Sequence, residues 1–294
     1  IISSKHNMYF GKPGAFGERG ANFIVQNCDF YLSIGTRLPF MVTGYNSKRY
    51  AIEAKFKAMV DIDQHELKKN DLKINLKVKS DAKFFLDKLY KNIKNYHASE
   101  KWLKYCNNTK KKYPILIKKM ITQRKFVNSY FFVNKLSKST KSFDTIVTDM
   151  GFSFTSSHQA FEAKDNQNFY TNSGHAPMGW GLPAAIGAYY SKKKINSRVI
   201  CLTGEGGFQM NIQELATIMH HKLPIKIFIF NNGGYLTIKQ TQILGFKGRI
   251  MGADKKSGLS FPNYKEIAKS HSIKYFQIKN HRNIENKIIS IINN

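Results

Sequence analysis

The segment "RVICLTGEGGFQMNIQELATIMHHKLPIKIFIFNN", residues 198–232, has an apolar run at each end and a helix-like stretch between them. The two runs have the length and composition of buried strands, and residues 211–222 carry apolar side chains at helical spacing. Asn211 and Glu214 fit a capping box at the start of that helix. A strand–helix–strand crossover makes its two strands parallel. The segment therefore predicts a βαβ unit, whose ligands bind at the carboxyl ends of the strands.

The rest of the chain shows the same alternation of strand and helix patterns. Residues 95 to 127 differ, because they are rich in Lys, Asn and Tyr and contain only a helical turn or two at 100–105. We predict an α/β protein of two Rossmann-like domains with mainly parallel sheets, spanning residues 1–106 and 128–294, with a linker at 107–127. Further strands are expected at 29–35, 57–63, 143–151 and 272–278, and further helices at 17–27, 80–94, 129–140, 178–192, 263–271 and up to Asn294.

The turn after the strand at 198–204 combines glycines with a single carboxylate, Glu205. Gly206 and Gly207 leave backbone N–H groups available before a helix, which suits a phosphate. Asn232 ends the next parallel strand, so its amide oxygen reaches the same sheet edge as Glu205. Hard oxygen ligands of this kind suit Mg²⁺ or Ca²⁺. The residues predict a diphosphate held through one metal ion; the alternative is an ordinary turn without a ligand.

Composition limits the other classes of function. Lys and Arg total 47 against 19 acidic residues, giving a net charge of +28. The basic residues are spread along the chain without an Arg-rich block, which favours a solvated surface over a nucleic-acid face. Cys28, Cys106 and Cys201 show no metal-binding spacing, as expected of a reduced, cytoplasmic protein. No apolar run approaches the ~20 residues of a membrane span.

Several ordered motifs resemble one known family. The pattern "GEGGFQMNIQEL…PIKIFIFNN" is similar to the Gly-Asp-Gly…Asn-Asn motif of thiamine-diphosphate-dependent enzymes. "TNSGHAPMGWGLPAAIGA" at 171–188 resembles the preceding segment of acetolactate synthases, and "VDIDQHEL", "TDMG" and "SGLSFPNYKEIAKS" occur in matching order. The resemblance implies an enzyme that uses thiamine diphosphate and Mg²⁺ and acts on a 2-oxo acid such as pyruvate. It implies decarboxylation with carboligation, a transferase or lyase activity; another decarboxylase or lyase of the family is the alternative.

The resemblance also assigns roles to individual residues. Glu205 stands where the family has a metal-binding Asp, Asn232 is the second ligand, and the backbone oxygen of Gly234 is the third. Met178 matches the apolar residue beneath the thiazolium ring, and the Ala176 carbonyl would accept from the pyrimidine amine. The other cofactor contacts that it implies are the diphosphate contacts Gly151, Ser153, Gly206 and Gly207 and the neighbouring side chains Tyr235 and Ile238.

Two matters stay open under this resemblance. Some members bind FAD in the central domain, and the residues that would contact it here are Gly35, Arg37, Asp61 and Asp63. The family's activating glutamate belongs to a separate N-terminal domain that meets this one across a dimer interface, so we expect the chain to be a fragment without a catalytic residue of its own. It would lack its last strand and form a homodimer or tetramer when complete. The alternative from another class is an inactive, basic interaction module.

Overall fold

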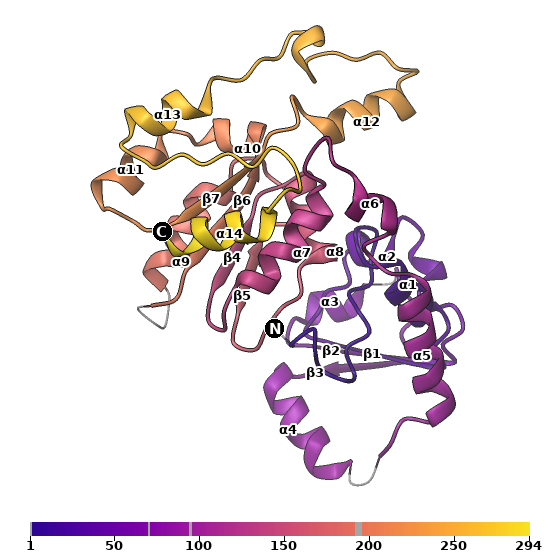
Figure 1. The fold of residues 1–294 in the computed structure, drawn as a ribbon. Helices are drawn as coiled ribbons and strands as arrows, with labels where there is room; N and C mark the ends of the chain where they lie inside the picture. The colour runs from indigo at the N-terminus through magenta and orange to yellow at the C-terminus, as the bar shows by residue number, and fades with distance from the viewer. Residues whose placement is uncertain (1, 70, 94–95, 192–195) are drawn as a thin grey trace. The chain divides into compact units, whose positions relative to one another are not determined.

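The computed structural model describes residues 2–69, 71–93, 96–191 and 196–294. It comprises two compact units, an N-terminal unit of residues 10–115 and a C-terminal unit of residues 1–9 and 116–294. Each is built around a sheet of parallel strands with helices in the connections (Figure 1). The predicted α/β class with two Rossmann-like units is therefore confirmed.

The N-terminal unit has a three-stranded parallel sheet in the order β1-β2-β3. Its central strand is almost wholly buried, as its apolar sequence predicts. The strands are β1 (Phe30–Ile34), β2 (Phe56–Asp61) and β3 (Leu76–Lys79). Its helices are α1 (Arg19–Gln26), α2 (Phe40–Thr43), the 3₁₀ turn η1 (Ser47–Arg49), α3 (Gln64–Lys68), α4 (Ala82–Asn92) and α5 (Glu100–Lys112).

Helix α5 differs from the expectation of one or two helical turns at 100–105. It runs for 13 residues, with the Ser99 hydroxyl accepting from the Trp102 N–H at its start. Cys106 and Thr109 are buried on it, and the helix packs along α1. The Lys-rich composition obscured this helix, although three of its five lysines, Lys110, Lys111 and Lys112, lie in the last turn, where cations stabilise the carbonyl end. The division between the two units falls after Ile115, and the domain bounds with a linker at 107–127 stay a prediction.

The C-terminal unit has a four-stranded parallel sheet in the order β5-β4-β6-β7. Its strands are β4 (Thr145–Thr148), β5 (Asn168–Thr171), β6 (Val199–Gly204) and β7 (Lys226–Phe230). The register pairs Thr148 with Leu202 and Gly204 with Phe230, which brings the carboxyl ends of β4, β6 and β7 to one edge. The chain leaves β4 in one direction to form β5 and continues on the other side to form β6. This reversal creates a topological switch point, the usual ligand site of open α/β sheets.

The helices of this unit lie on both faces of its sheet. They are α6 (Lys118–Thr122), α7 (Ser129–Ser139), α8 (Phe152–Ala160), α9 (Gly181–Ser191), α10 (Glu205–Met210), α11 (Glu214–His220), α12 (Leu236–Gly245), the 3₁₀ turn η2 (Lys255–Ser257), α13 (Tyr264–Ser270) and α14 (Ile284–Asn293). The predicted helices at 80–94 and 178–192 are confirmed up to Asn92 and Ser191; residues 94 and 192 lie outside the described residues.

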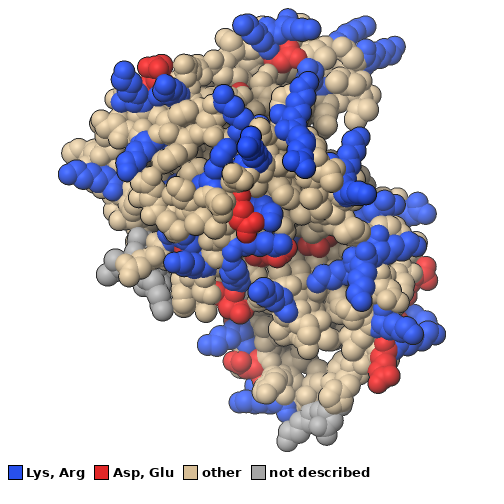
Figure 2. Space-filling model, viewed as in Figure 1, with Lys and Arg blue, Asp and Glu red and all other residues tan. Residues whose placement is uncertain are grey.

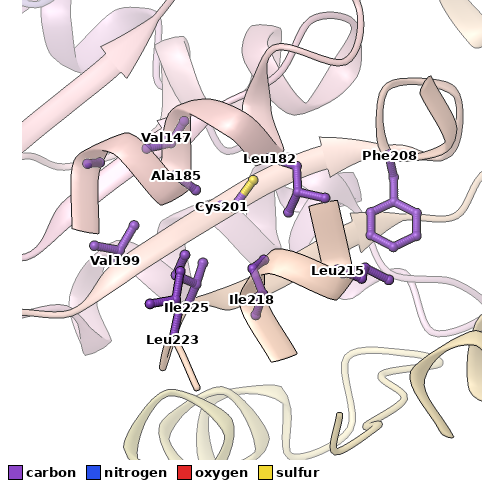
Figure 3. Packing of buried hydrophobic residues seen from close by; sticks show 11 residues of the cluster. Val147, Leu182, Ala185, Val199, Cys201, Phe208, Leu215, Ile218, Leu223 and Ile225 are labelled. Carbon is purple, nitrogen blue, oxygen red and sulfur yellow. The ribbon is translucent and has the colours of Figure 1, made fainter. Parts of the chain in front are cut away.

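A continuous hydrophobic core joins α9 and α11 to one face of the sheet. Figure 3 shows Leu182 and Ala185 of α9 beside Cys201 of β6, with Leu215 and Ile218 of α11 nearby. The small residues of α9 allow this close packing against β4 and β6. On the other face, Phe132 of α7 packs edge-on against Phe228 and Phe230 of β7, with ring centroids 5.2 and 5.6 Å apart.

Two local predictions in this unit are wrong. Residues 272–278 were expected to be a strand, but no strand forms there, and the aromatic side chains of Tyr275 and Phe276 are 41% and 45% exposed. An alternating pattern becomes a strand only where a neighbouring strand pairs with it. The capping box is also absent: the N-cap of α11 is Gln213, without a side-chain bond. The Asn211 amide instead donates to the Gly179 carbonyl at 2.8 Å.

Candidate functional site

The candidate site lies at the switch point, where the chain leaves β4 and β6. The segment after β6, expected to be a glycine loop, is the short helix α10, which begins at Glu205 directly after the strand. Its N-cap, Gly204, contributes no side chain. The first N–H groups of such a helix have no intrahelical partner and project beyond its end. The residues predicted to bind a diphosphate, Gly206 and Gly207, therefore lie in the first turn of this helix.

Glu205 joins the end of β6 to the turn after β7. Its side chain is buried, and its Oε2 accepts three backbone N–H groups, from Asn232 at 2.8 Å, Gly233 at 2.8 Å and Gly234 at 3.2 Å. Successive N–H groups converge on one oxygen because the two glycines adopt positive φ values of 78° and 157°. The predicted proximity of Glu205 to Asn232 and Gly234 is therefore present, and a set of backbone hydrogen bonds maintains it.

The oxygens at this position fit a small, hard cation. The bonds described above use Oε2 of Glu205, while its second carboxylate oxygen, the Asn232 amide oxygen and the Gly234 carbonyl are ligand types that Mg²⁺ prefers. The described residues hold no group of three or more His, Cys, Asp or Glu that could bind a metal. A cation here would thus depend on one carboxylate with amide and backbone oxygens, as the resemblance implies.

Gly206 and Gly207 are required by close packing. A Cβ at Gly206 would clash with the Tyr235 ring and lie 2.6 Å from Cε of Met178. A Cβ at Gly207 would clash with the carboxylate of Asp149, lying 2.7 Å from its Cγ. The structure therefore brings Met178 and Tyr235 together over Gly206, while their contacts with a cofactor stay a prediction.

We expect Gly206→Ala to lower the free energy of unfolding by about 1–3 kcal/mol, because the Tyr235 ring must move to admit a methyl group. Urea titration followed by circular dichroism measures this change. Gly204→Ala is the matched control, since a Cβ there meets nothing within 4 Å. Equal stability losses in the two variants would contradict the proposed packing around Gly206.

The loop that carries Ala176 and Met178 is held at both ends. The Ala176 N–H donates to the Asn172 carbonyl at 2.9 Å, and Ala176 adopts a left-handed φ of 54°. After Met178, Gly179 donates its N–H to Asp149 and accepts from the Asn211 amide. Ala176 is exposed and Met178 half-buried, so this loop presents both residues at the sheet edge.

Gly151 and Ser153 lie at the start of α8. Gly151 is its N-cap with a φ of 90°, and a Cβ there would lie 3.7 Å from Oγ1 of Thr237, next to α12. Ser153 is buried, with its hydroxyl within hydrogen-bond distance of the Asp149 and Met150 carbonyls, at 3.1 and 3.2 Å. Its side chain therefore turns toward the backbone. Ile238 lies on α12, one turn after Tyr235, with 39% of its surface exposed.

Sequence reasoning assigned no role to Asp149, which the structure places at the centre of this region. It follows β4 and is 1% exposed. Its carboxylate accepts the N–H groups of Met150 and Gly179 and the Thr203 hydroxyl. Burial raises the pKa of this carboxyl group, and the hydrogen bonds partly oppose the shift. The available signal was an acidic residue near the end of the strand predicted at 143–151.

Tyr264 of α13 is a second residue near the site to which the sequence pattern assigned no role. Its ring packs against Phe208 with centroids 5.7 Å apart, and its buried hydroxyl has no hydrogen-bond partner within the described ranges. Burial raises the pKa of this hydroxyl, and the nearby charge of Glu205 raises it further. Tyr264 therefore lies on the same side of the sheet edge as Glu205, where it packs beside the candidate site.

Family models match both parts of the chain. Residues 149–294 match the model described as thiamine pyrophosphate enzyme, C-terminal TPP binding domain, and residues 1–89 match the central domain of the same enzymes. The chain belongs to the thiamine pyrophosphate enzyme family. Thiamine pyrophosphate is another name for thiamine diphosphate, so the matches agree with the implied cofactor. The site described above lies within the first match.

Curated relatives of this thiamine pyrophosphate enzyme chain include large subunits of acetolactate synthase. The one from Cyanidium caldarium is 32% identical, over 97% of this chain and 48% of its own length. A probable large subunit from Methanococcus aeolicus is 30% identical, over 99% of this chain and 50% of its own length. The isozyme 2 large subunit of Escherichia coli is 29% identical, over 84% of this chain and 43% of its own length. The chain spans about half the length of the curated relatives it matches.

The residues named for FAD lie at the carboxyl edge of the other sheet. Gly35, with a φ of 60°, and the exposed Arg37 follow β1. Asp61 ends β2 and accepts the Asp63 N–H at 2.9 Å, while Asp63 caps α3 by accepting the His65 N–H at 2.8 Å. The two acids thus have structural contacts of their own, and flavin binding stays a prediction. No described helix is long and apolar enough to cross a membrane.

Proposed function

We propose that the chain is the part of an acetolactate-synthase-like enzyme that binds thiamine diphosphate and Mg²⁺. The substrate class is a 2-oxo acid such as pyruvate, and the reaction is decarboxylation followed by carboligation. The observation that carries the proposal is the convergence of Glu205 with the turn after β7, beside Gly206, at a topological switch point. Another 2-oxo-acid decarboxylase or lyase of the family is the second candidate.

Each residue group has a distinct task in this proposal. Glu205, Asn232 and the Gly234 carbonyl hold the cation, which neutralises the diphosphate next to a carboxylate that would otherwise repel it. The N–H groups at the starts of α8 and α10 face the diphosphate, with Gly151, Ser153, Gly206 and Gly207 as the named positions. When bound, the cofactor supplies the nucleophilic carbon and the electron sink for loss of carbon dioxide.

The remaining residues orient and enclose the reactive part of the cofactor. Met178 supports its ring from below, the Ala176 carbonyl accepts from the pyrimidine amine, and Tyr235 and Ile238 pack beside it. We assign no catalytic residue within the chain, because the activating glutamate is expected in a separate domain. The proposed setting is a homodimeric or tetrameric enzyme of the cytoplasm that includes that domain.

Isothermal titration calorimetry tests the proposal. We expect the purified chain to bind thiamine diphosphate in the presence of Mg²⁺, and binding to weaken strongly when EDTA removes the metal, because the cation bridges carboxylate and diphosphate. Folded protein that gives no binding heat with both components present would contradict it. Binding that is equally tight with and without the metal would contradict the role of Glu205.

Two other properties have simple tests. Figure 2 shows Lys and Arg side chains spread over the whole of the face in view, with fewer acidic ones among them. An inactive, basic interaction module would bind RNA or DNA with an affinity that falls steeply with salt, and would not bind thiamine diphosphate.

FAD binding through Gly35, Arg37, Asp61 and Asp63 would give the purified protein a flavin absorption spectrum; a colourless protein that takes up no added FAD would contradict it.

A further inference from the structure

Asp149 connects three segments of the proposed cofactor site. The Gly179 N–H lies 3.1 Å from each of its carboxylate oxygens, and the Thr203 hydroxyl donates to Oδ2 at 3.1 Å. The Met150 N–H donates to Oδ1 at 2.8 Å. One buried side chain at the end of β4 thus holds both the loop that follows Met178 and the end of β6.

The packing around Asp149 adds α10 to this arrangement. Gly207 approaches so closely that a Cβ would lie 2.7 Å from Cγ of Asp149, and a Cβ at Gly181 would lie 2.9 Å from its Cβ. The carboxylate therefore fixes the spacing between α10 and the start of α9. Asp149 therefore packs directly against residues of the proposed site.

The chemistry of Asp149 is unusual for a residue that only fills space. Among the described residues it takes part in no ion pair, although it is 1% exposed. A buried carboxylate is unfavourable unless hydrogen bonds compensate it, and apolar residues of similar volume usually fit a core better. Unlike an apolar side chain, this carboxylate accepts directional hydrogen bonds from the Gly179 N–H and the Thr203 hydroxyl.

We infer that Asp149 is a positioning residue that sets Met178 and the Gly206–Gly207 pair at the separation required for thiamine diphosphate. This inference rests on the proposed function. Asp149 acts through Gly179, Gly207 and Thr203, and its side-chain hydrogen bonds do not involve the proposed metal ligands. Its effect concerns the geometry of cofactor binding.

Asp149→Asn tests the inference in the full chain. Since the Gly179 N–H lies equally close to both carboxylate oxygens, either orientation of the amide places an NH₂ group beside it. We expect the Kd for thiamine diphosphate with Mg²⁺ to rise about 10-fold or more, as for other residues that orient a site indirectly. Trp180, next to Gly179, should show an altered fluorescence response to the cofactor.

Asp144→Asn is the matched control. Asp144 is the second buried carboxylate beside β4, 2% exposed, and it lies at the opposite end of the strand. Its replacement should lower the melting temperature and leave the Kd for thiamine diphosphate unchanged. A similar rise in Kd for both variants would mean that general destabilisation causes the effect, and would overturn the inference.

Thr203 provides a second pair of variants in case Asp149→Asn does not fold. Thr203→Val removes the hydroxyl that donates to Asp149, whereas Thr203→Ser keeps it. We expect the valine variant to bind more weakly than wild type and the serine variant to recover the affinity. Normal binding by Thr203→Val, or by a folded Asp149→Asn, would overturn the inference alone. Absence of binding by the wild type would overturn the proposed function and with it this role of Asp149.

Discussion

Glu205→Ala is expected to weaken Mg²⁺-dependent binding of thiamine diphosphate by at least about 100-fold and to lower the free energy of unfolding by about 2–4 kcal/mol. The first effect follows because the proposed metal site has a single carboxylate. The second follows because three N–H groups, from Asn232, Gly233 and Gly234, lose a charged acceptor. Calorimetry and urea titration measure the two effects separately.

Two further variants separate these roles of Glu205. Glu205→Asp shortens the side chain, so the carboxylate reaches fewer of the three N–H groups while still offering an oxygen to the cation; stability should fall more than affinity. Glu214→Ala is the control, because Glu214 contacts the Thr217 hydroxyl on α11 and not the sheet edge. If Glu205→Ala bound the cofactor as tightly as Glu214→Ala, the metal assignment would be wrong.

Asp144→Ala is expected to cause the largest loss of stability, about 3–5 kcal/mol, because it leaves the Arg198 guanidinium without its carboxylate partner. Asp144 accepts Nη2 of Arg198 at 2.5 Å, and also the backbone N–H groups of Arg198 and Lys141 at 3.1 and 2.7 Å. The two side chains are 2% and 15% exposed, so water cannot replace the lost contacts easily. Urea denaturation measures the change.

The exposed pair between Lys135 and Glu285 is the control for this effect. Nζ of Lys135 and Oε2 of Glu285 are 2.8 Å apart, but the side chains are 26% and 48% exposed. Lys135→Ala should therefore change the free energy of unfolding by less than about 1 kcal/mol. Adding Arg198→Met to Asp144→Ala should recover part of the loss, since the uncompensated charge is then removed. Equal losses in the two single variants would contradict the distinction between the buried and the exposed pair.

The elements that the sequence predicted well are those whose own pattern determines them. The strands β1, β2, β4, β6 and β7 are mainly apolar or β-branched segments, and each overlaps its predicted range. The parallel crossover then brought Glu205 and Asn232 to one edge, as predicted. Local pattern and global fold agree there, as expected of well-specified segments.

The elements that were missed depend on distant contacts. Nothing within "GEGGFQM" indicates that Gly206 needs its missing Cβ for Tyr235, or that the segment is helical. The capping role given to Asn211 failed because its amide bonds to Gly179, 32 residues away in sequence. Asp149 is equally dependent on tertiary structure, since its partners Gly179 and Thr203 come from other segments.

A crystal structure of the chain with thiamine diphosphate and Mg²⁺ tests the central claim most directly, because it shows the ligands of the cation. We predict a cation bound to the cofactor diphosphate with oxygens of Glu205, Asn232 and Gly234 about 2.0–2.1 Å away. The diphosphate should lie at the start of α10. A cation without contact to Glu205, or a diphosphate away from the ends of β4 and β6, would contradict the account.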